Sequence, residues 1–247
     1  MTPFQLAGVA GPRIGLGTNR LTTAPEHVEL VRQAVAAGVR HIDTAHLYCG
    51  GDSERALGVA LEGVGEQVLV ATKGGFGDGA PATIAAQLEQ SLQALRTETI
   101  GLYYLHQVDD DVPIEESLAP IVAAVERGAV RHVGVSNVTV DQIERARRVV
   151  PIAAVQNHFN LTEGDGGVID HCEREGIAFV PFFPLRGGGR GVAAAAERLG
   201  ATENQVKLAW LLARSPVVAP IPGTLSIEHV RENLAAEELG DVGDVTG

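Results

Sequence analysis

The sequence predicts an α/β protein folded as one (β/α)8 TIM barrel, with residues 1–247 forming a single domain. Short apolar runs typical of buried strands alternate with segments that have the period of amphipathic helices, a pattern typical of a parallel sheet. Eight such units over 247 residues give about 31 residues each, close to the length of one βα repeat. The alternation runs along the chain without a linker-like break.

Eight apolar runs are the predicted strands. They cover residues 13–18, 39–43, 68–72, 100–105, 130–135, 152–155, 177–181 and 217–221. In a parallel barrel the carboxyl ends of the strands meet at one face, where active sites gather. We therefore expect functional side chains at or just after the last residue of each run.

Helices are predicted between the strands from apolar spacing and capping residues. Two capping boxes, each a threonine with a glutamine three residues later, begin helices at Thr139 and Thr202. Gly176 is expected to end a helix over residues 168–174. The other predicted helices cover 26–37, 54–61, 81–95, 113–128, segments that follow a glycine-rich loop at 185–191, and 227–238. Residues 240–247 are expected to form a frayed tail.

Composition narrows the possible functions. The formal net charge is −12, which argues against nucleic-acid phosphate and anionic lipid as partners. No apolar run reaches the roughly 18 residues of a membrane span, and the first residues lack the pattern of a signal peptide. The two cysteines, Cys49 and Cys172, lie far apart without metal-type spacing, which favours a reducing compartment. We expect a cytoplasmic protein, and its oligomeric state stays open.

Ionisable side chains end three consecutive predicted strands. Asp43, Lys73 and His106 hold these positions, and Tyr48 follows the first of them. Each residue alone has a structural explanation, such as a turn cap, a solvated lysine or a core histidine. Matched positions at successive strand ends favour a shared catalytic site instead.

Other motifs are weaker. The segment GLGTNR at 15–20 has Arg20 where a dinucleotide fingerprint needs its third glycine, and no acid follows at the usual distance. The segment 72–79 lacks the lysine pattern of a phosphate-binding P-loop. His41, His46 and His106 match no zinc spacing, so we expect no metal.

A series of motifs in order resembles the aldo-keto reductase superfamily. They are DTAHLYCGGDSERALG at 43–58, ATK at 71–73, YLH at 104–106, GVSN at 134–137, VQN at 155–157, PFFPL at 181–185, and IPGT at 221–224 with EN at 232–233. The chain is most similar to compact bacterial-type members that have IPG rather than IPK in the last strand. The match extends from about residue 14 to residue 234.

The resemblance implies a barrel enzyme that reduces a carbonyl to an alcohol by hydride transfer from NADPH. It implies a catalytic tetrad of Asp43, Tyr48, Lys73 and His106. Developing negative charge on the carbonyl oxygen needs stabilisation and a proton, which Tyr48 would donate. We expect the ammonium of Lys73 to lower the pKa of that phenol, since a free phenol is a weak acid at neutral pH.

The resemblance also implies cofactor contacts. Ser136, Asn137 and Gln156 match carboxamide contacts, and Phe182 matches the aromatic ring that stacks on the nicotinamide. The loop from Leu185 would wrap the pyrophosphate. The full expected set is Thr18, Ser136, Asn137, Gln156, Phe182, Leu185, Arg186, Gly187, Gly223, Thr224, His229, Arg231 and Asn233.

The pattern departs from the family where the adenosine 2′-phosphate is expected. Gly223 and His229 replace a lysine and an arginine, and Arg231 is the expected compensating cation. NADPH is the expected cofactor, with NADH as the alternative.

The substrate side is expected to be open, because the loop after the seventh strand is short and a carboxyl-terminal extension is missing. Leu21, Cys49, Phe76 and Gln107 are the candidate substrate contacts for a small carbonyl compound. Two alternatives remain: a cofactor-binding regulatory barrel without significant turnover, and a lyase or isomerase that uses Lys73 as a Schiff-base amine.

Overall fold

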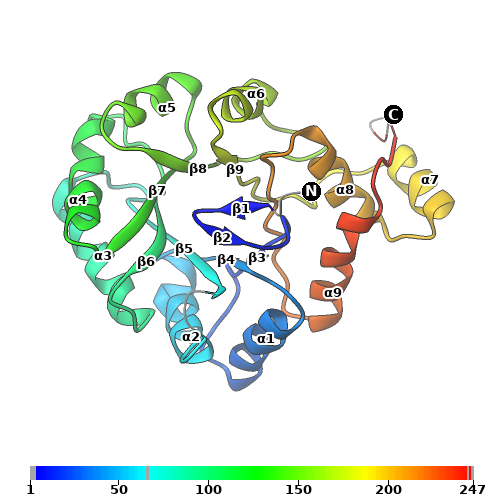
Figure 1. The fold of residues 1–247 in the computed structure, drawn as a ribbon, viewed down its shortest axis with the longest axis horizontal. Coiled ribbons are helices and arrows are strands. Elements are labelled where there is room, and N and C mark those ends of the chain that lie inside the picture. Colours follow the sequence, from blue (N-terminus) through cyan, green and yellow to red (C-terminus); the bar gives the residue numbers. More distant parts are fainter. Residues whose placement is uncertain (1–3, 65–66, 244, 246–247) are drawn as a thin grey trace.

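Seven parallel strands form the sheet of the computed structural model, which describes residues 4–64, 67–243 and 245. They pair in chain order and curl into a barrel, and the helices lie around its outside (Figure 1). The strands are β3 (Leu16–Gly17), β4 (His41–Asp43), β5 (Leu69–Gly74), β6 (Ile100–Leu105), β7 (Val130–Ser136), β8 (Ile152–Gln156) and β9 (Ala178–Phe179). The predicted barrel is confirmed.

The eighth predicted strand, 217–221, is replaced by two isolated parallel bridges that still close the barrel. One bridge joins Phe179 to Val218 and the other joins Gly17 to Gly223. Backbone hydrogen bonds reach both neighbours, as Ala219 N donates to Phe179 O at 2.8 Å and Gly17 N donates to Pro222 O at 3.2 Å. Pro220 and Pro222 have no amide hydrogen, so this segment cannot form a complete ladder.

The helices follow the predicted order. Both capping boxes are present, at Thr139 with Gln142 and at Thr202 with Gln205, and left-handed Gly176 ends α6 as predicted. The helices are α1 (Pro25–Ala36), α2 (Asp52–Ala60), α3 (Pro81–Ala94), α4 (Ile114–Glu126), α5 (Val140–Arg147), α6 (Gly166–Glu175), α7 (Arg190–Leu199), α8 (Glu203–Arg214) and α9 (Ile227–Ala235), with the 3-10 segments η1 (Tyr48–Gly51) and η3 (Ala236–Glu238).

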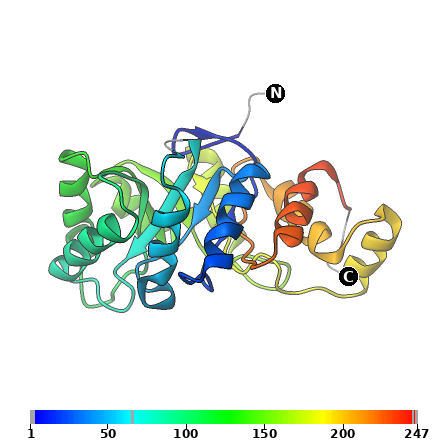
Figure 2. The same cartoon turned by 90° about the horizontal axis from the view of Figure 1, so that it is seen from below.

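An antiparallel hairpin, β1 (Gln5–Leu6) with β2 (Val9–Ala10), was not predicted from the sequence. Its strands are too short to show alternation. Leu6 is 3% exposed and packs with interior residues such as Leu69, the first residue of β5. The hairpin therefore covers the amino-terminal end of the barrel and leaves the carboxyl ends of the strands open (Figures 1 and 2).

The main core lies between the sheet and the helices, and a second cluster fills the barrel interior. In the tail that was expected to fray, Val242 and Val245 are 2% and 3% exposed and pack in a cluster with α7 and α8. Residues 244, 246 and 247 of that tail lie outside the described residues. Among the described helices, none has the length and apolar character to cross a membrane.

Arg13, which precedes β3, joins this segment to the end of α8 and to the loop that follows it. Its Nε donates to Val218 O at 2.9 Å, and its Nη2 donates to Leu212 O at 2.9 Å and to Ser215 O at 2.5 Å. One guanidinium thus satisfies three carbonyls beside the bridge segment that closes the barrel. Hydrogen bonds from a charged donor to partly buried carbonyls are among the stronger ones.

We predict that Arg13→Met lowers the free energy of unfolding by about 2–4 kcal/mol, because three carbonyls lose a charged donor. Urea denaturation measures the change. The matched control is Arg32→Met, since Arg32 is half exposed, pairs with exposed Glu29 at 3.7 Å and donates one long, exposed hydrogen bond to Val59 O at 3.4 Å. Its effect should stay within about 0.5 kcal/mol. Equal effects of the two substitutions would show that the three hydrogen bonds of Arg13 do not stabilise the fold.

Candidate active site

A buried ion pair lies at the carboxyl ends of β4 and β5. Lys73 Nζ donates to Asp43 Oδ1 at 2.5 Å and to Thr44 O at 2.6 Å, and Lys73 and Asp43 are 0% and 1% exposed. The other carboxylate oxygen of Asp43 accepts a hydrogen bond from Gln156 Nε2 at 2.7 Å. Both oxygens of the buried carboxylate are therefore satisfied, which a buried charge requires.

Hydroxyl groups fix the backbone beneath this pair. Ser53, near the start of α2, bonds through Oγ to the hydroxyls of Thr18 at 2.8 Å and Thr44 at 2.7 Å. Thr18 Oγ1 also donates to Asp43 O at 2.8 Å. The ends of β3 and β4 are thus tied to α2, and the Asp43 carboxylate is held in one place.

Tyr48 lies on η1, in the loop between β4 and α2. Its Oη is 3.4 Å from Lys73 Nζ, and the ammonium lies 4.9 Å from the centroid of its ring. The loop turns sharply after Tyr48, because Cys49 and the two glycines that follow it are all left-handed. The structure therefore brings together the phenol, ammonium and carboxylate that the sequence placed at separate positions.

His106 follows β6 and completes the group. Its ring centroid lies 6.1 Å from that of Tyr48, in an edge-to-face arrangement, and 4.9 Å from that of Phe76. Its backbone carbonyl accepts a hydrogen bond from Asn137 Nδ2 at 3.0 Å. Burial, and then the charge of Lys73, lower the pKa of His106 to about 3, so the imidazole is neutral at physiological pH.

The acidities of Tyr48 and Lys73 are coupled. Burial raises the pKa of Tyr48, and the neighbouring Lys73 ammonium offsets this only in part. Lys73 therefore acts on the phenol in the expected direction, but the net pKa of Tyr48 is still raised, because desolvation of the phenolate outweighs the attraction of the ammonium. Burial also acts to lower the pKa of Lys73, but Asp43 and then Tyr48 raise it, and the net shift is upward.

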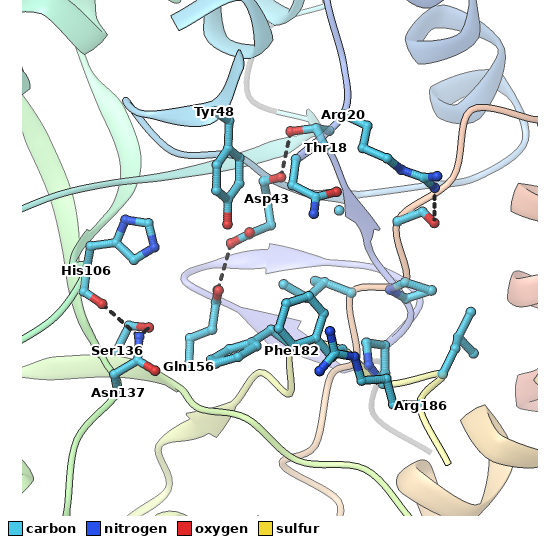
Figure 3. A pocket seen from close by; sticks show the side chains of 18 of the residues that line it. Thr18, Arg20, Asp43, Tyr48, His106, Ser136, Asn137, Gln156, Phe182 and Arg186 are labelled. Carbon is cyan, nitrogen blue, oxygen red and sulfur yellow. Dashed lines mark hydrogen bonds between the residues drawn. The ribbon is translucent and has the colours of Figure 1, made fainter. Parts of the chain in front are cut away.

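A cavity of about 610 Å³ opens beside these side chains (Figure 3). In Figure 3, Tyr48 and His106 lie at the left of the view and Arg20 and Arg186 at the right. The lining includes three tetrad members and eight expected cofactor contacts: Asp43, Tyr48, His106, Thr18, Ser136, Asn137, Gln156, Phe182, Leu185, Arg186 and Gly223. Lys73 lies beneath this surface, fully buried.

Aromatic and amide groups line the middle of the cavity. The ring of Phe182 stacks on His158, with centroids 5.4 Å apart and planes at 19°, so one ring face is covered while the residue still lines the cavity. Asn137 has a left-handed backbone with φ +56°, and its Nδ2 lies 3.2 Å from Ser136 Oγ. A planar ligand with an amide group fits between such groups.

Five expected cofactor residues are not among those that line this cavity: Gly187, Thr224, His229, Arg231 and Asn233. Thr224 Oγ1 and His229 Nδ1 are 3.3 Å apart, Arg231 is exposed on α9, and Asn233 is 5% exposed. Their roles stay predictions.

Sequence reasoning missed several lining residues, among them Asn19, Arg20 and Phe183. Arg20 reaches across the cavity edge, where its Nη2 donates to Gly223 O at 3.3 Å. The position of Asn19 and Arg20, directly after a strand end, was the signal that would have indicated them. Phe183 has a left-handed backbone with φ +51°, which no local pattern predicts.

Of the four candidate substrate contacts, Phe76 lines the cavity and is 55% exposed. Leu21 is 1% exposed and packs in the main core, so its predicted contact with substrate is wrong. Cys49 and Gln107 are exposed and are not among the lining residues.

A parallel barrel with a phenol, a buried ammonium–carboxylate pair and a neutral imidazole beside an aromatic-lined cavity defines a barrel oxidoreductase site. The chain belongs to the aldo/keto reductase family, because residues 13–242 match the profile of that family.

Known relatives agree with this assignment. The chain is 36% identical to pyridoxine 4-dehydrogenase of Escherichia coli over 96% of the chain and 93% of the relative. It is 35% identical to an uncharacterized oxidoreductase of Schizosaccharomyces pombe over 91% of the chain and 81% of the relative. The crystal structure of a thermostable aldo-keto reductase in complex with epalrestat superposes with a TM-score of 0.88 at 31% identity, covering 96% of this chain and 94% of that one. The protein is therefore an NAD(P)H-dependent oxidoreductase of the aldo-keto reductase type.

His41 gives the first prediction from this site, because it lies two residues before Asp43 and is buried. Neither of its ring nitrogens has a hydrogen-bond partner among the described residues. Burial lowers its pKa to about 4. Between pH 6.5 and 4 the unfolded chain binds a proton here that the folded chain does not, so stability falls as the pH falls. We expect this residue to remove about 2 kcal/mol of unfolding free energy between pH 7.5 and pH 5.

Urea denaturation at pH 7.5 and pH 5 of the parent and of His41→Gln measures this effect. The loss on acidification should be smaller in the variant by about 2 kcal/mol. An equal loss in both proteins would show that His41 is not buried in its neutral form.

Proposed function

We propose that this protein reduces the carbonyl group of a small aldehyde or ketone with NADPH, and that Tyr48 donates the proton. The observation that carries the proposal is the position of Tyr48 Oη, 3.4 Å from Lys73 Nζ and at the wall of the cavity. The phenol is thus placed between an ammonium and the space that a substrate oxygen would occupy.

The cavity residues fit a nicotinamide. Phe182 offers a ring surface on its cavity side, while Ser136 and Asn137 offer polar groups for a carboxamide. Gly17 allows β3 to lie close to the segment at Ile221 in the cavity wall, because a Cβ on Gly17 would lie 2.7 Å from Ile221 O. The cofactor supplies the hydride, and the protein supplies position and electrostatics.

The remaining chemistry belongs to the side chains. As negative charge develops on the carbonyl oxygen, the Tyr48 phenol, protonated at neutral pH because its pKa is raised, donates its proton. The Lys73 ammonium stabilises the phenolate left behind, and Asp43 keeps that ammonium charged and oriented. Neutral His106 donates one ring N–H toward the substrate oxygen and so fixes its approach.

Two observations support NADPH as the cofactor. Similar solved structures include aldo-keto reductases of Klebsiella pneumoniae with NADP or NADPH, at TM-scores of 0.84 and 0.86. The exposed guanidinium of Arg231 on α9 is the cation proposed to bind the 2′-phosphate, since Gly223 has no side chain for this.

The two alternatives make different demands on the site. A regulatory barrel would bind nucleotide without needing a proton donor. Here Tyr48 and His106 line the cavity, and the Lys73 ammonium lies directly behind the Tyr48 phenol. A Schiff-base mechanism needs a neutral amine, but the pKa of Lys73 is raised by Asp43 and Tyr48 against the effect of burial. These observations favour the reductase.

The substrate side is open and partly aromatic. Phe76 and Phe183 are 55% and 44% exposed and both line the cavity. Similarity to a pyridoxine 4-dehydrogenase makes pyridoxal a rational member of a test panel, with aliphatic aldehydes and sugars.

We predict that Tyr48→Phe lowers kcat at least about 100-fold, because the proton donor is lost, while the Kd for NADPH stays the same. Nicotinamide oxidation over the carbonyl panel measures turnover, and calorimetry measures binding. The control is Tyr103→Phe, since Tyr103 is buried in the main core and its hydroxyl has no hydrogen-bond partner in the part of the chain that the structure describes. Parent-like turnover by the Tyr48 variant would refute the assigned donor.

We also predict that Arg231→Gln raises the Kd for NADPH about tenfold and leaves that for NADH unchanged, because only NADPH has the 2′-phosphate. Titration of parent and variant with both nucleotides measures the difference. Equal or better use of NADH by the parent protein would overturn the preference for NADPH.

A further inference from the structure

The chain contains two lysines, Lys73 and Lys207, and both are buried in the structure. Lys73 has the partners described above. Lys207 lies on α8, outside the catalytic group, and is 9% exposed. A second lysine whose side chain is mostly buried, in a chain whose other strong bases are all arginines, requires an explanation.

The partners of Lys207 within the described residues do not satisfy its charge. Its nearest carboxylate oxygen is Glu203 Oε2 at 4.0 Å, beyond hydrogen-bond distance, and the Glu203 side chain is 55% exposed. At this distance, and with the carboxylate exposed to solvent, the attraction between the two groups is weak. Lys207 Nζ has no hydrogen-bond acceptor among the described residues and is not one of the fully buried, unpartnered atoms, so an anionic ligand can reach it.

The ammonium lies against the glycine-rich loop that precedes α7. A side-chain carbon on Gly188 would come within 3.6 Å of Lys207 Nζ and 3.5 Å of its Cε. On the other side of the loop, a Cβ on Gly187 would come 2.9 Å from a carbon of Thr162. The loop backbone is therefore held between Lys207 and residues 161–162, and α7 packs on α8 beside it (Figure 1).

The same loop leads into the cavity. Arg186 lines the cavity two residues before Gly188, and its guanidinium lies 4.0 Å from the ring centroid of Phe183. The amides of Gly187 and Gly188 make no hydrogen bond to any described residue. Free backbone amides next to two cations are typical of an anion-binding loop.

We propose that Lys207, with its ammonium against Gly188, binds the pyrophosphate of the nicotinamide dinucleotide together with the loop amides and Arg186. The inference rests on the proposed function, since it assigns a new residue to the cofactor that this function requires. A pyrophosphate carries two negative charges, and a protein of net charge −12 needs local cations to hold it. The group is common to NADPH and NADH, so Lys207 contributes to both.

The test compares Lys207→Met, Lys207→Arg and Glu203→Gln by calorimetric titration with NADPH and with NADH. Lys207→Met should raise the Kd for both nucleotides about tenfold, Lys207→Arg should recover most of the affinity, and Glu203→Gln should not weaken binding. Unchanged affinity in Lys207→Met overturns the inference. A loss confined to NADPH also overturns it, because that result would place the ammonium on the 2′-phosphate.

Amine labelling of the unmodified parent protein provides a test that does not depend on a variant. Because Lys73 is fully buried, acetylation followed by mass spectrometry reports on Lys207 with little overlap. NADPH and NADH should each slow the labelling of Lys207, and labelling that is insensitive to both overturns the inference. If the parent protein binds neither nucleotide, the proposed function fails first; if it binds and turns over without protecting Lys207, only this inference fails.

Discussion

The ion pair between Lys73 and Asp43 is the interaction on which the site depends. Burial of both charges is unfavourable unless each is neutralised and hydrogen-bonded, and removal of either partner would leave an uncompensated charge. The barrel meets this requirement with Thr44 O on the ammonium, just after β4, and with Gln156 of β8 on the carboxylate. Asp43 and Lys73 come from neighbouring strands β4 and β5, whereas the hydrogen bond that satisfies the second carboxylate oxygen comes from β8 and needs the curled sheet.

The two ends of the barrel serve different purposes. The β1–β2 hairpin packs Leu6 against interior residues and covers one end, which contributes to stability. At the other end the strand termini stay open, and the loops carry the functional side chains. The segment that closes the barrel contains Pro220 and Pro222 and pairs only at isolated bridges, and Gly17 allows it to approach β3 closely. The residues that close the barrel thus also form part of the cavity wall.

The two ends of the cavity differ in how deeply their polar groups are buried. At the catalytic end, Asp43, Lys73 and Gln156 are buried and hydrogen-bonded. Such fixed positions favour proton transfer, because small displacements of the reacting groups lower its rate. At the other end, exposed Arg20 and Arg186 and the glycine-rich loop offer cations and backbone amides, which suit the entry and release of a charged cofactor. A site that must both fix a reacting group and exchange a dinucleotide needs both kinds of surface.

The sequence by itself determined the parallel barrel and most of the site, because strand periodicity places Asp43, Lys73, His106, Ser136 and Gln156 at carboxyl ends that a parallel sheet brings together. The sequence did not determine how deeply each side chain is buried, or which loop residues from distant parts of the chain come into contact. Tertiary packing alone decided three features: the burial of Leu21 in the core, the direction in which the pKa of Tyr48 shifts, and the approach of Lys207 to Gly188. Spacing is a local property of the chain, whereas desolvation and contact between distant loops depend on what the folded structure places around each group.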